Sequence, residues 1–137
     1  MTKKVLCPID GTDHSQHAVE VAAEIATKFG AELVLCLVNV AHGGGRGPLI
    51  HHWTDAEAQQ ILDNAAGVAS QHGQKNLRTV TVIHREAASG IIGLAESEGV
   101  DHIVMGTGDK RGLSRLVLGS VAADVAGRAH CSVTIAR

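Results

Sequence analysis

The 137-residue sequence has almost no phenylalanine, tyrosine or tryptophan: Phe29 and Trp53 are the only two. Proteins that bind single-stranded nucleic acid usually stack bases on such rings, so this class is disfavoured. The formal net charge of −2 gives no basic surplus for binding the backbone of duplex DNA or RNA. We therefore expect no nucleic-acid partner.

Cysteines and long apolar runs are also scarce. The three cysteines, Cys7, Cys36 and Cys131, form no C-x-x-C pair, and each lies in or at the start of an apolar run. This pattern is typical of reduced, buried thiols in a cytoplasmic protein, and that is the location we expect. Pro8 and Asp10 end the first apolar run too early for a signal peptide. No run approaches the ~18 apolar residues of a membrane-spanning helix, so we predict no membrane span.

Apolar residues nevertheless make up 45% of the chain, and they are mainly alanine, valine, leucine and isoleucine. They form short β-rich runs that alternate with helical patterns, which indicates one domain over residues 1–137. Strands are expected at residues 3–9, 31–40, 77–84, 102–106 and 131–137. Helices are expected at residues 13–29 and 54–73, in a short segment marked by Ile91, Ile92 and Ala95, and from about residue 120 onward.

Several positions are expected to fix the ends of these elements. Asp13 can cap the first helix with Gln16 reaching back, and Thr54 and Glu57 form a capping box for the second. Glycines are expected to end three helices: Gly30, Gly73 and Gly99. Residues 41–54 are rich in glycine and histidine and are interpreted as a mobile loop.

Strands that alternate with helices predict an α/β fold with a parallel sheet and helices on both faces. Ligands in such sheets bind beyond the carboxyl ends of the strands. The stretch PIDGTD follows the first strand, and a glycine-rich loop follows the fourth. If these two strands are neighbours, the two loops face each other across one crevice.

The stretch VMGTGDKRGLSRLVLGSVAADV is either a phosphate-binding loop or a flexible connection. Gly119 and Ser120 stand where the last helix begins, and unpaired N–H groups at a helix start suit an anion. Gly106 has no Cβ that would block a ribose or a phosphate. The P-loop pattern is absent, and Arg111 replaces the third glycine of a dinucleotide fingerprint.

Other candidate residues leave alternatives open. Asp10 either accepts hydrogen bonds from a ribose or a base, or supports the turn into the first helix. His14 and His17 lie three residues apart without a carboxylate to complete a metal site, so we predict no metal ligands. No G-x-S-x-G nucleophile motif occurs, and we identify no catalytic residue.

The whole chain from Lys4 to Arg137 resembles the universal stress protein family. The resemblance rests on VLCPIDGTDHSQHAVEVA, VDHIVMGTGDKRGLSRLVLGSVAADV and CSVTIAR. The nucleotide motif of the ATP-binding branch is Gly, two residues, Gly, nine residues, then Gly followed by Ser or Thr. Gly106, Gly119 and Ser120 match it, whereas Asp109 stands in place of the second glycine.

The resemblance implies a Rossmann-like or flavodoxin-like sheet of five parallel strands in the order 3-2-1-4-5. It also implies ATP as the ligand, and Mg²⁺ is a candidate ion between Asp109 and the phosphates. Asp10 would face the adenosine and Val40 the adenine. The implied nucleotide site consists of Pro8, Asp10, Val40, Gly106, Asp109, Gly119, Ser120 and Val121.

The functional hypothesis is a cytoplasmic ATP-binding stress or regulatory protein that acts as a homodimer on an unidentified protein partner. The dimer is expected to form through the last strand, which lies at a sheet edge. Two alternatives stay open: a nucleotide-free interaction module that uses the dimer surface and the 41–54 loop, and a slow ATPase.

Overall fold

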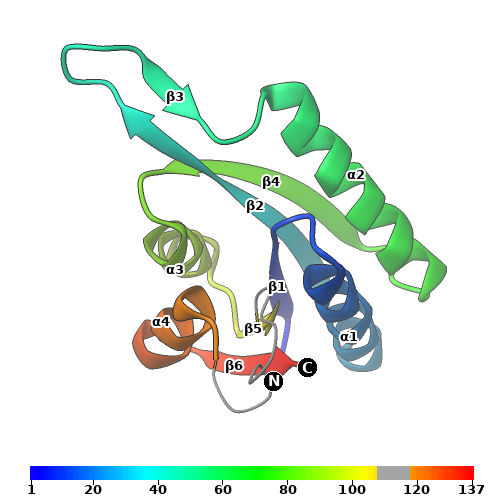
Figure 1. The fold of residues 1–137 in the computed structure, drawn as a ribbon. Helices are drawn as coiled ribbons and strands as arrows, with labels where there is room; N and C mark the ends of the chain where they lie inside the picture. The colour runs from blue at the N-terminus through cyan, green and yellow to red at the C-terminus, as the bar shows by residue number, and fades with distance from the viewer. Residues whose placement is uncertain (108–117) are drawn as a thin grey trace.

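Strands and helices alternate along residues 1–107 and 118–137, which are the residues that this computed structural model describes (Figure 1). The strands are β1 (Lys4–Ile9), β2 (Glu32–Gly43), β3 (Leu49–His51), β4 (Leu77–His84), β5 (His102–Gly106) and β6 (Ser132–Ala136). The helices are α1 (Asp13–Phe29), α2 (Asp55–Gln71), α3 (Ala87–Glu98) and α4 (Ser120–Arg128). None of these helices is long and apolar enough to cross a membrane.

The parallel strands of the sheet lie in the order β4-β2-β1-β5-β6. Helices α1 and α2 lie on one side of this sheet, and α3 and α4 lie on the other (Figure 1). The α/β fold with helices on both faces is therefore confirmed. Strands β1 and β5 are neighbours, as the crevice argument required.

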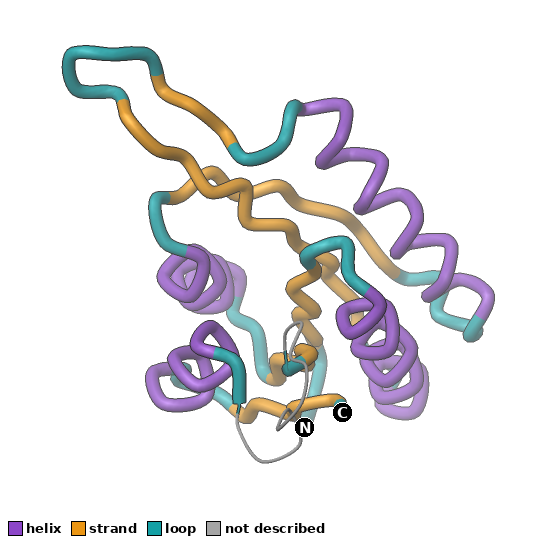
Figure 2. The backbone as a smooth tube through the Cα atoms, in the orientation of Figure 1, coloured by secondary structure: helices purple, strands orange, loops and turns teal. Residues whose placement is uncertain are grey.

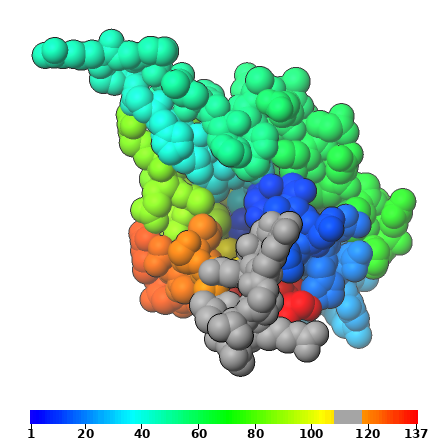
Figure 3. All heavy atoms as spheres, viewed as in Figure 1, coloured from blue at the N-terminus to red at the C-terminus, as the bar shows by residue number. Residues whose placement is uncertain are grey.

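The predicted five-strand order differs from the observed sheet by one strand, because β3 was missed. Residues 41–43 continue β2 and pair antiparallel with residues 49–51, with His42 opposite Ile50. The interpretation of residues 41–54 as a loop is therefore wrong for these two segments, which form paired strands. Figure 2 traces the hairpin, and Figure 3 shows it projecting from the body of the protein.

Glycine makes this hairpin possible. Gly43 has a φ of +83°, and a Cβ atom on it would lie only 2.6 Å from the carbonyl oxygen of Pro48. Other residues rarely adopt that backbone conformation, and here they would also collide with the opposite arm. The glycine run that suggested a loop in the sequence thus allows the two arms to approach closely.

The helix ends match the predicted residues with two corrections. The capping box of α2 is confirmed, with Thr54 N–H donating to Glu57 Oε1 over 2.9 Å. Gly30 and Gly99 end their helices in the left-handed conformation. Thr12 rather than Asp13 caps α1, because its Oγ1 accepts from Ser15 N. Helix α2 ends at Gln71 with His72 as its cap, before Gly73.

The core has two parts, one on each face of the sheet. Alternating side chains of β1 and β2 pack against α1 and α2, and the intervening ones pack against α3 and α4. Cys7 belongs to the first part and Cys36 to the second, and both are fully buried. Burial raises the pKa of Cys36 to about 12 and that of Cys7 still higher. Cys131 is half-buried, and all three thiols are free.

Candidate functional site

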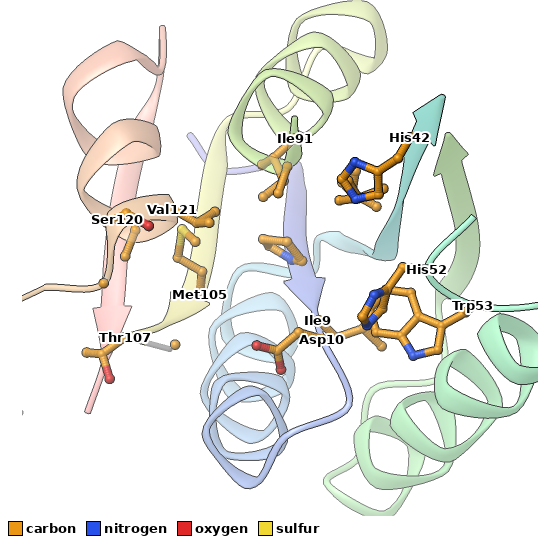
Figure 4. Close-up of a pocket in the computed structure, with 17 residues that line it drawn as sticks. Ile9, Asp10, His42, His52, Trp53, Ile91, Met105, Thr107, Ser120 and Val121 are labelled. Atoms are coloured by element: carbon orange, nitrogen blue, oxygen red, sulfur yellow. The ribbon is translucent and has the colours of Figure 1, made fainter. Parts of the chain in front are cut away.

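A pocket of about 560 Å³ opens at the carboxyl edge of the sheet (Figure 4). Its size is in the range of small-molecule sites. Six segments line it. They contribute Pro8, Ile9 and Asp10 at the end of β1; Val38, Val40 and His42 of β2; His52 and Trp53 before α2; Ala87 and Ile91 of α3; Met105, Gly106 and Thr107 at the end of β5; and Gly119 to Ala122 at the start of α4.

The structure brings together the residues that the sequence predicted for a site. Seven of them line the pocket: Pro8, Asp10, Val40, Gly106, Gly119, Ser120 and Val121. The eighth, Asp109, lies outside the described residues. The crevice between the segments after the first and fourth predicted strands is therefore present, and residues of both segments line the same cavity.

Asp10 supports the turn into α1 and also borders the pocket. Its Oδ1 accepts hydrogen bonds from Thr12 N over 3.0 Å and from Thr12 Oγ1 over 2.7 Å. This holds Thr12 in place as the cap of α1. The Asp10 carboxylate is exposed, and its Oδ2 has no hydrogen-bond partner within the described parts of the chain. The two interpretations of Asp10 are thus compatible, since one oxygen fixes the turn and the other is open to a ligand.

Packing against α1 requires a glycine at position 106, and the sequence did not reveal this requirement. A Cβ atom on it would lie 2.8 Å from the carbonyl oxygen of His14 and 3.1 Å from the carbonyl carbon. Real Cβ atoms essentially never approach the backbone so closely. The missing side chain therefore makes room for the first turn of α1, although Gly106 also lines the pocket.

The start of α4 forms one end of the pocket. Gly119 is the N-cap, with φ −61° and ψ 156°, and no described side chain caps the helix there. Gly119 N donates to Thr107 O over 3.0 Å, which ties the helix start to the end of β5. The first N–H groups of a helix are unpaired within it and carry partial positive charge. With the exposed hydroxyl of Ser120, this end suits an anionic group.

Apolar side chains form the walls between the two ends of the pocket. Val38 and Val40 come from β2, Ile91 from α3, Met105 from β5 and Val121 from α4. Figure 4 shows Ile91 at the top of the view and Val121 and Met105 on the side where Ser120 lies. A slot with aliphatic walls and few polar groups suits a flat, largely apolar ring.

The end opposite α4 contains residues that the sequence analysis did not select. These are His42, His52 and Trp53, which Figure 4 shows across the cavity from Ser120 and Val121. The spacing of Val38, Val40 and His42 follows the two-residue period of a strand, so continuing β2 by two residues would have found His42. No comparable signal marks the other two, because their position depends on contacts between distant residues.

The charge of the described lining is small. Asp10 is its one carboxylate, and it holds no lysine or arginine. Lys110, Arg111 and Arg115, the basic residues of the glycine-rich stretch between β5 and α4, lie outside the described residues. Within the described ranges no group of three His, Cys, Asp or Glu residues could hold a metal ion. Among the described lining residues, Asp10 alone offers a carboxylate to a magnesium ion that also binds the phosphates of a nucleotide.

A mostly parallel sheet with helices on both faces and a pocket at its carboxyl edge defines a Rossmann-like α/β protein with a candidate ligand site. The sequence model of the universal stress protein family matches residues 1–137. The chain belongs to that family.

Relatives and solved structures agree with this assignment. Universal stress protein MJ0531 of Methanocaldococcus jannaschii is 36% identical over 146 residues, which cover 98% of this chain and 82% of that protein. A universal stress protein in complex with cAMP is 25% identical, with a TM-score of 0.78 over 98% of this chain and 95% of that one. A universal stress protein from Archaeoglobus fulgidus in complex with dAMP shares the fold, with a TM-score of 0.74, 22% identity and coverage of 100% and 98%.

Proposed function

We propose that this protein binds an adenine nucleotide in the pocket at the carboxyl edge of its sheet. One observation above all supports this: the uncapped start of α4 lies at one end of a cavity that has aliphatic walls, and the Asp10 carboxylate borders the same cavity. The phosphate would lie at Gly119 and Ser120, the ribose at Asp10 and the base between Val40 and Ile91. A relative of 25% identity was solved in complex with cAMP.

The residues fit an adenine nucleotide, and we further propose ATP as the physiological ligand. The site supplies N–H groups and a hydroxyl for phosphate, a carboxylate for the ribose hydroxyls and aliphatic walls for the base. Bound nucleotide would then set the surface that the protein presents to a regulatory partner in the cytoplasm. These groups hold the parts of a nucleotide, so binding rather than rapid turnover is the proposed activity.

Analysis of the nucleotide content of the purified protein tests this proposal. Protein purified without added ligand is denatured, and the supernatant is examined by absorbance, chromatography and mass spectrometry. Calorimetric titration with AMP, cAMP and ATP, each with Mg²⁺ and with EDTA, follows. We expect bound adenine nucleotide or saturable binding below millimolar concentration. No nucleotide and no binding at millimolar concentration would contradict the proposal and favour the nucleotide-free interaction module.

We also propose that the protein is a homodimer through β6. This strand pairs with β5 on one side, and within the described residues its other edge has no partner strand. Val133 and Ile135 pack against the core cluster that lies beside α3 and α4. Charges at these two positions would therefore damage the fold as well as a dimer, so they make a poor test.

The exposed Ser132 makes a cleaner test of the dimer. Sedimentation velocity at micromolar concentration should show a wild-type dimer. Ser132→Lys should weaken it, because like charges repel across paired strands, whereas Ser97→Lys on the exposed side of α3 should have no effect. A wild-type monomer at these concentrations would contradict the proposal.

A further inference from the structure

The β2–β3 hairpin presents two histidine rings to the pocket. His42 is opposite Ile50, and the next hydrogen bond joins His52 N–H to Val40 O over 2.9 Å. Because side chains alternate across a strand, Val40, His42 and His52 share one face of the hairpin. All three line the pocket, whereas His51 lies on the other face and is not among the described lining residues. Figure 4 shows both rings at the cavity.

A buried polar contact fixes this wall. Asn39 is fully buried, and its Nδ2 donates to Trp53 O over 2.9 Å while its Oδ1 accepts from Trp53 N over 3.0 Å. The Trp53 and His52 rings meet at 90° with centroids 4.4 Å apart. At the far end, Arg85 Nη2 donates to Gly43 O over 2.7 Å. Hydrogen bonds to the rest of the protein therefore fix the hairpin that carries the two rings, at Trp53 and at Gly43.

The two histidines lie at the end of the pocket away from the start of α4. In Figure 4, Ser120 and Val121 lie on one side, His42 and His52 on the other, and Asp10 between them. A nucleotide whose phosphate lies at the start of α4 extends its base toward the histidines. The aliphatic side chains of the slot contact the faces of such a base, but they have no hydrogen-bonding group for its polar edge.

Imidazole is suited to the polar edge of a base. A neutral imidazole has one N–H donor and one nitrogen acceptor, and it can exchange them by changing tautomer. The edge of adenine likewise has an amino donor beside a ring-nitrogen acceptor. A lysine or a carboxylate at the same place would offer only one of these functions.

We propose that His42 and His52 recognise the polar edge of the nucleobase by hydrogen bonding. This inference rests on the proposed function and extends it from the phosphate and the ribose to the base. Each hydrogen bond contributes roughly a three- to tenfold increase in affinity. Ligands that lack the base gain nothing from the two rings.

The test is calorimetric titration of the wild type and of single variants with AMP. His42→Ala and His52→Ala should each raise the dissociation constant about three- to tenfold. His42→Phe keeps a flat ring without its nitrogens and should lose as much as His42→Ala. His51→Ala, on the opposite face of the same hairpin, is the matched control and should bind like the wild type. Circular dichroism verifies that every variant is folded.

NMR adds a readout that does not depend on substitution. AMP should shift the ring C–H resonances of His42 and His52 and leave those of His72 unchanged. Ribose 5-phosphate, which lacks the base, should leave the resonances of His42 and His52 unchanged. Unchanged affinity in both alanine variants, full affinity in His42→Phe, or equal shifts with ribose 5-phosphate would each overturn base recognition alone. Failure of the wild type to bind AMP, cAMP and ATP overturns the proposed function and this inference together; if only ATP binds, the same variants are titrated with ATP.

Discussion

A Cβ atom on Gly106 would lie 2.8 Å from the carbonyl oxygen of His14, in the first turn of α1. The Gly106 backbone fixes the position of this Cβ, and the oxygen belongs to the His14 backbone. Neither atom can therefore move away as the end of a flexible side chain would. The identity of Gly106 follows from how closely β5 approaches α1. A glycine at this position is therefore needed for packing whether or not a nucleotide binds nearby.

Gly106→Ala is expected to destabilise the fold by about 1–3 kcal/mol, the usual cost of forcing an extra methyl group into a packed site. Urea unfolding without ligand measures this. Gly93→Ala is the matched control, because a Cβ there meets nothing within 4 Å and Gly93 lies inside α3. It should stabilise the protein by about 0.5–1 kcal/mol. Equal stability of Gly106→Ala and wild type would contradict the packing argument.

Asn39→Ala is expected to destabilise the protein by about 2–4 kcal/mol, because it leaves the N–H and C=O of Trp53 without their partner. Thermal and urea unfolding measure the loss. Trp53 is the single tryptophan, so its fluorescence reports whether the segment before α2 stays in place. Asn64→Ala is the control, since exposed Asn64 bonds only to Gln60 among the described residues, and it should change stability by less than about 0.5 kcal/mol.

Gly119→Val is expected to weaken nucleotide binding by at least about tenfold without unfolding the domain, because a branched side chain at the N-cap occupies the approach to the first N–H groups of α4. Calorimetry with AMP and ATP gives the affinity. Gly127→Val changes the other end of α4, where a Cβ meets nothing within 4 Å, and should leave the affinity unchanged. A folded Gly119→Val protein with wild-type affinity would show that the phosphate lies elsewhere.

Asp109→Gly is expected to tighten ATP binding about ten- to thirtyfold in EDTA. This prediction comes from the sequence alone, because Asp109 lies outside the described residues. A carboxylate near a phosphate opposes binding by roughly 1–2 kcal/mol after partial screening. Parallel titrations with Mg²⁺ separate two cases. If Asp109 binds Mg²⁺ together with the phosphates, the same substitution weakens binding in the presence of the metal.

Asp101 is expected to stabilise the fold in a pH-dependent way. Its Oδ2 accepts from Lys3 N over 2.8 Å and from Lys4 N over 2.9 Å, and these backbone hydrogen bonds lower the pKa of the carboxyl below its ordinary 3.8. A lowered folded-state pKa gives stability that is present above the unfolded-state value and lost as the pH falls through the folded-state value. The wild type should therefore be more stable than Asp101→Asn at neutral pH.

Urea unfolding at pH 7, 5 and 3 checks this prediction. The stability difference between wild type and Asp101→Asn should be constant from pH 7 to pH 5 and should shrink at pH 3 and below. Asp124→Asn, at an exposed position of α4, is the control and should show no such trend. A difference that stays constant down to the lowest pH would mean that the charge of Asp101 contributes nothing.

Most of the fold could be predicted because its signals are local. Residues 31–40 are almost entirely apolar, which indicates a strand buried on both faces, and Thr54 and Glu57 mark a helix start by themselves. The hairpin could not be predicted, since β3 is only three residues long and pairs with a strand end rich in glycine. At α1, Thr12 and Asp13 are both good capping residues. The hydrogen bonds from Thr12 to Asp10 favour Thr12.

The candidate site divides in the same way. Gly119 and Ser120 could be found from the sequence, because a glycine and a hydroxyl at a helix start have a recognisable chemistry. His52 and Trp53 could not, because Asn39 holds them at the pocket from 14 positions away. The reason for Gly106 was also hidden, since it depends on where α1 packs rather than on the neighbouring residues.

The placement of Cys7 and Cys36 on opposite faces of the sheet affects how the protein reacts with oxidants. The two sulfurs cannot approach each other through the sheet, so no internal disulfide joins them without unfolding. The thiolate is the nucleophile that attacks peroxides and alkylating reagents, and burial keeps both groups protonated. Half-buried Cys131 is therefore the thiol that reacts first in the native protein. The other two thiols react only after the whole domain unfolds, so their labelling rate measures the rate of global unfolding.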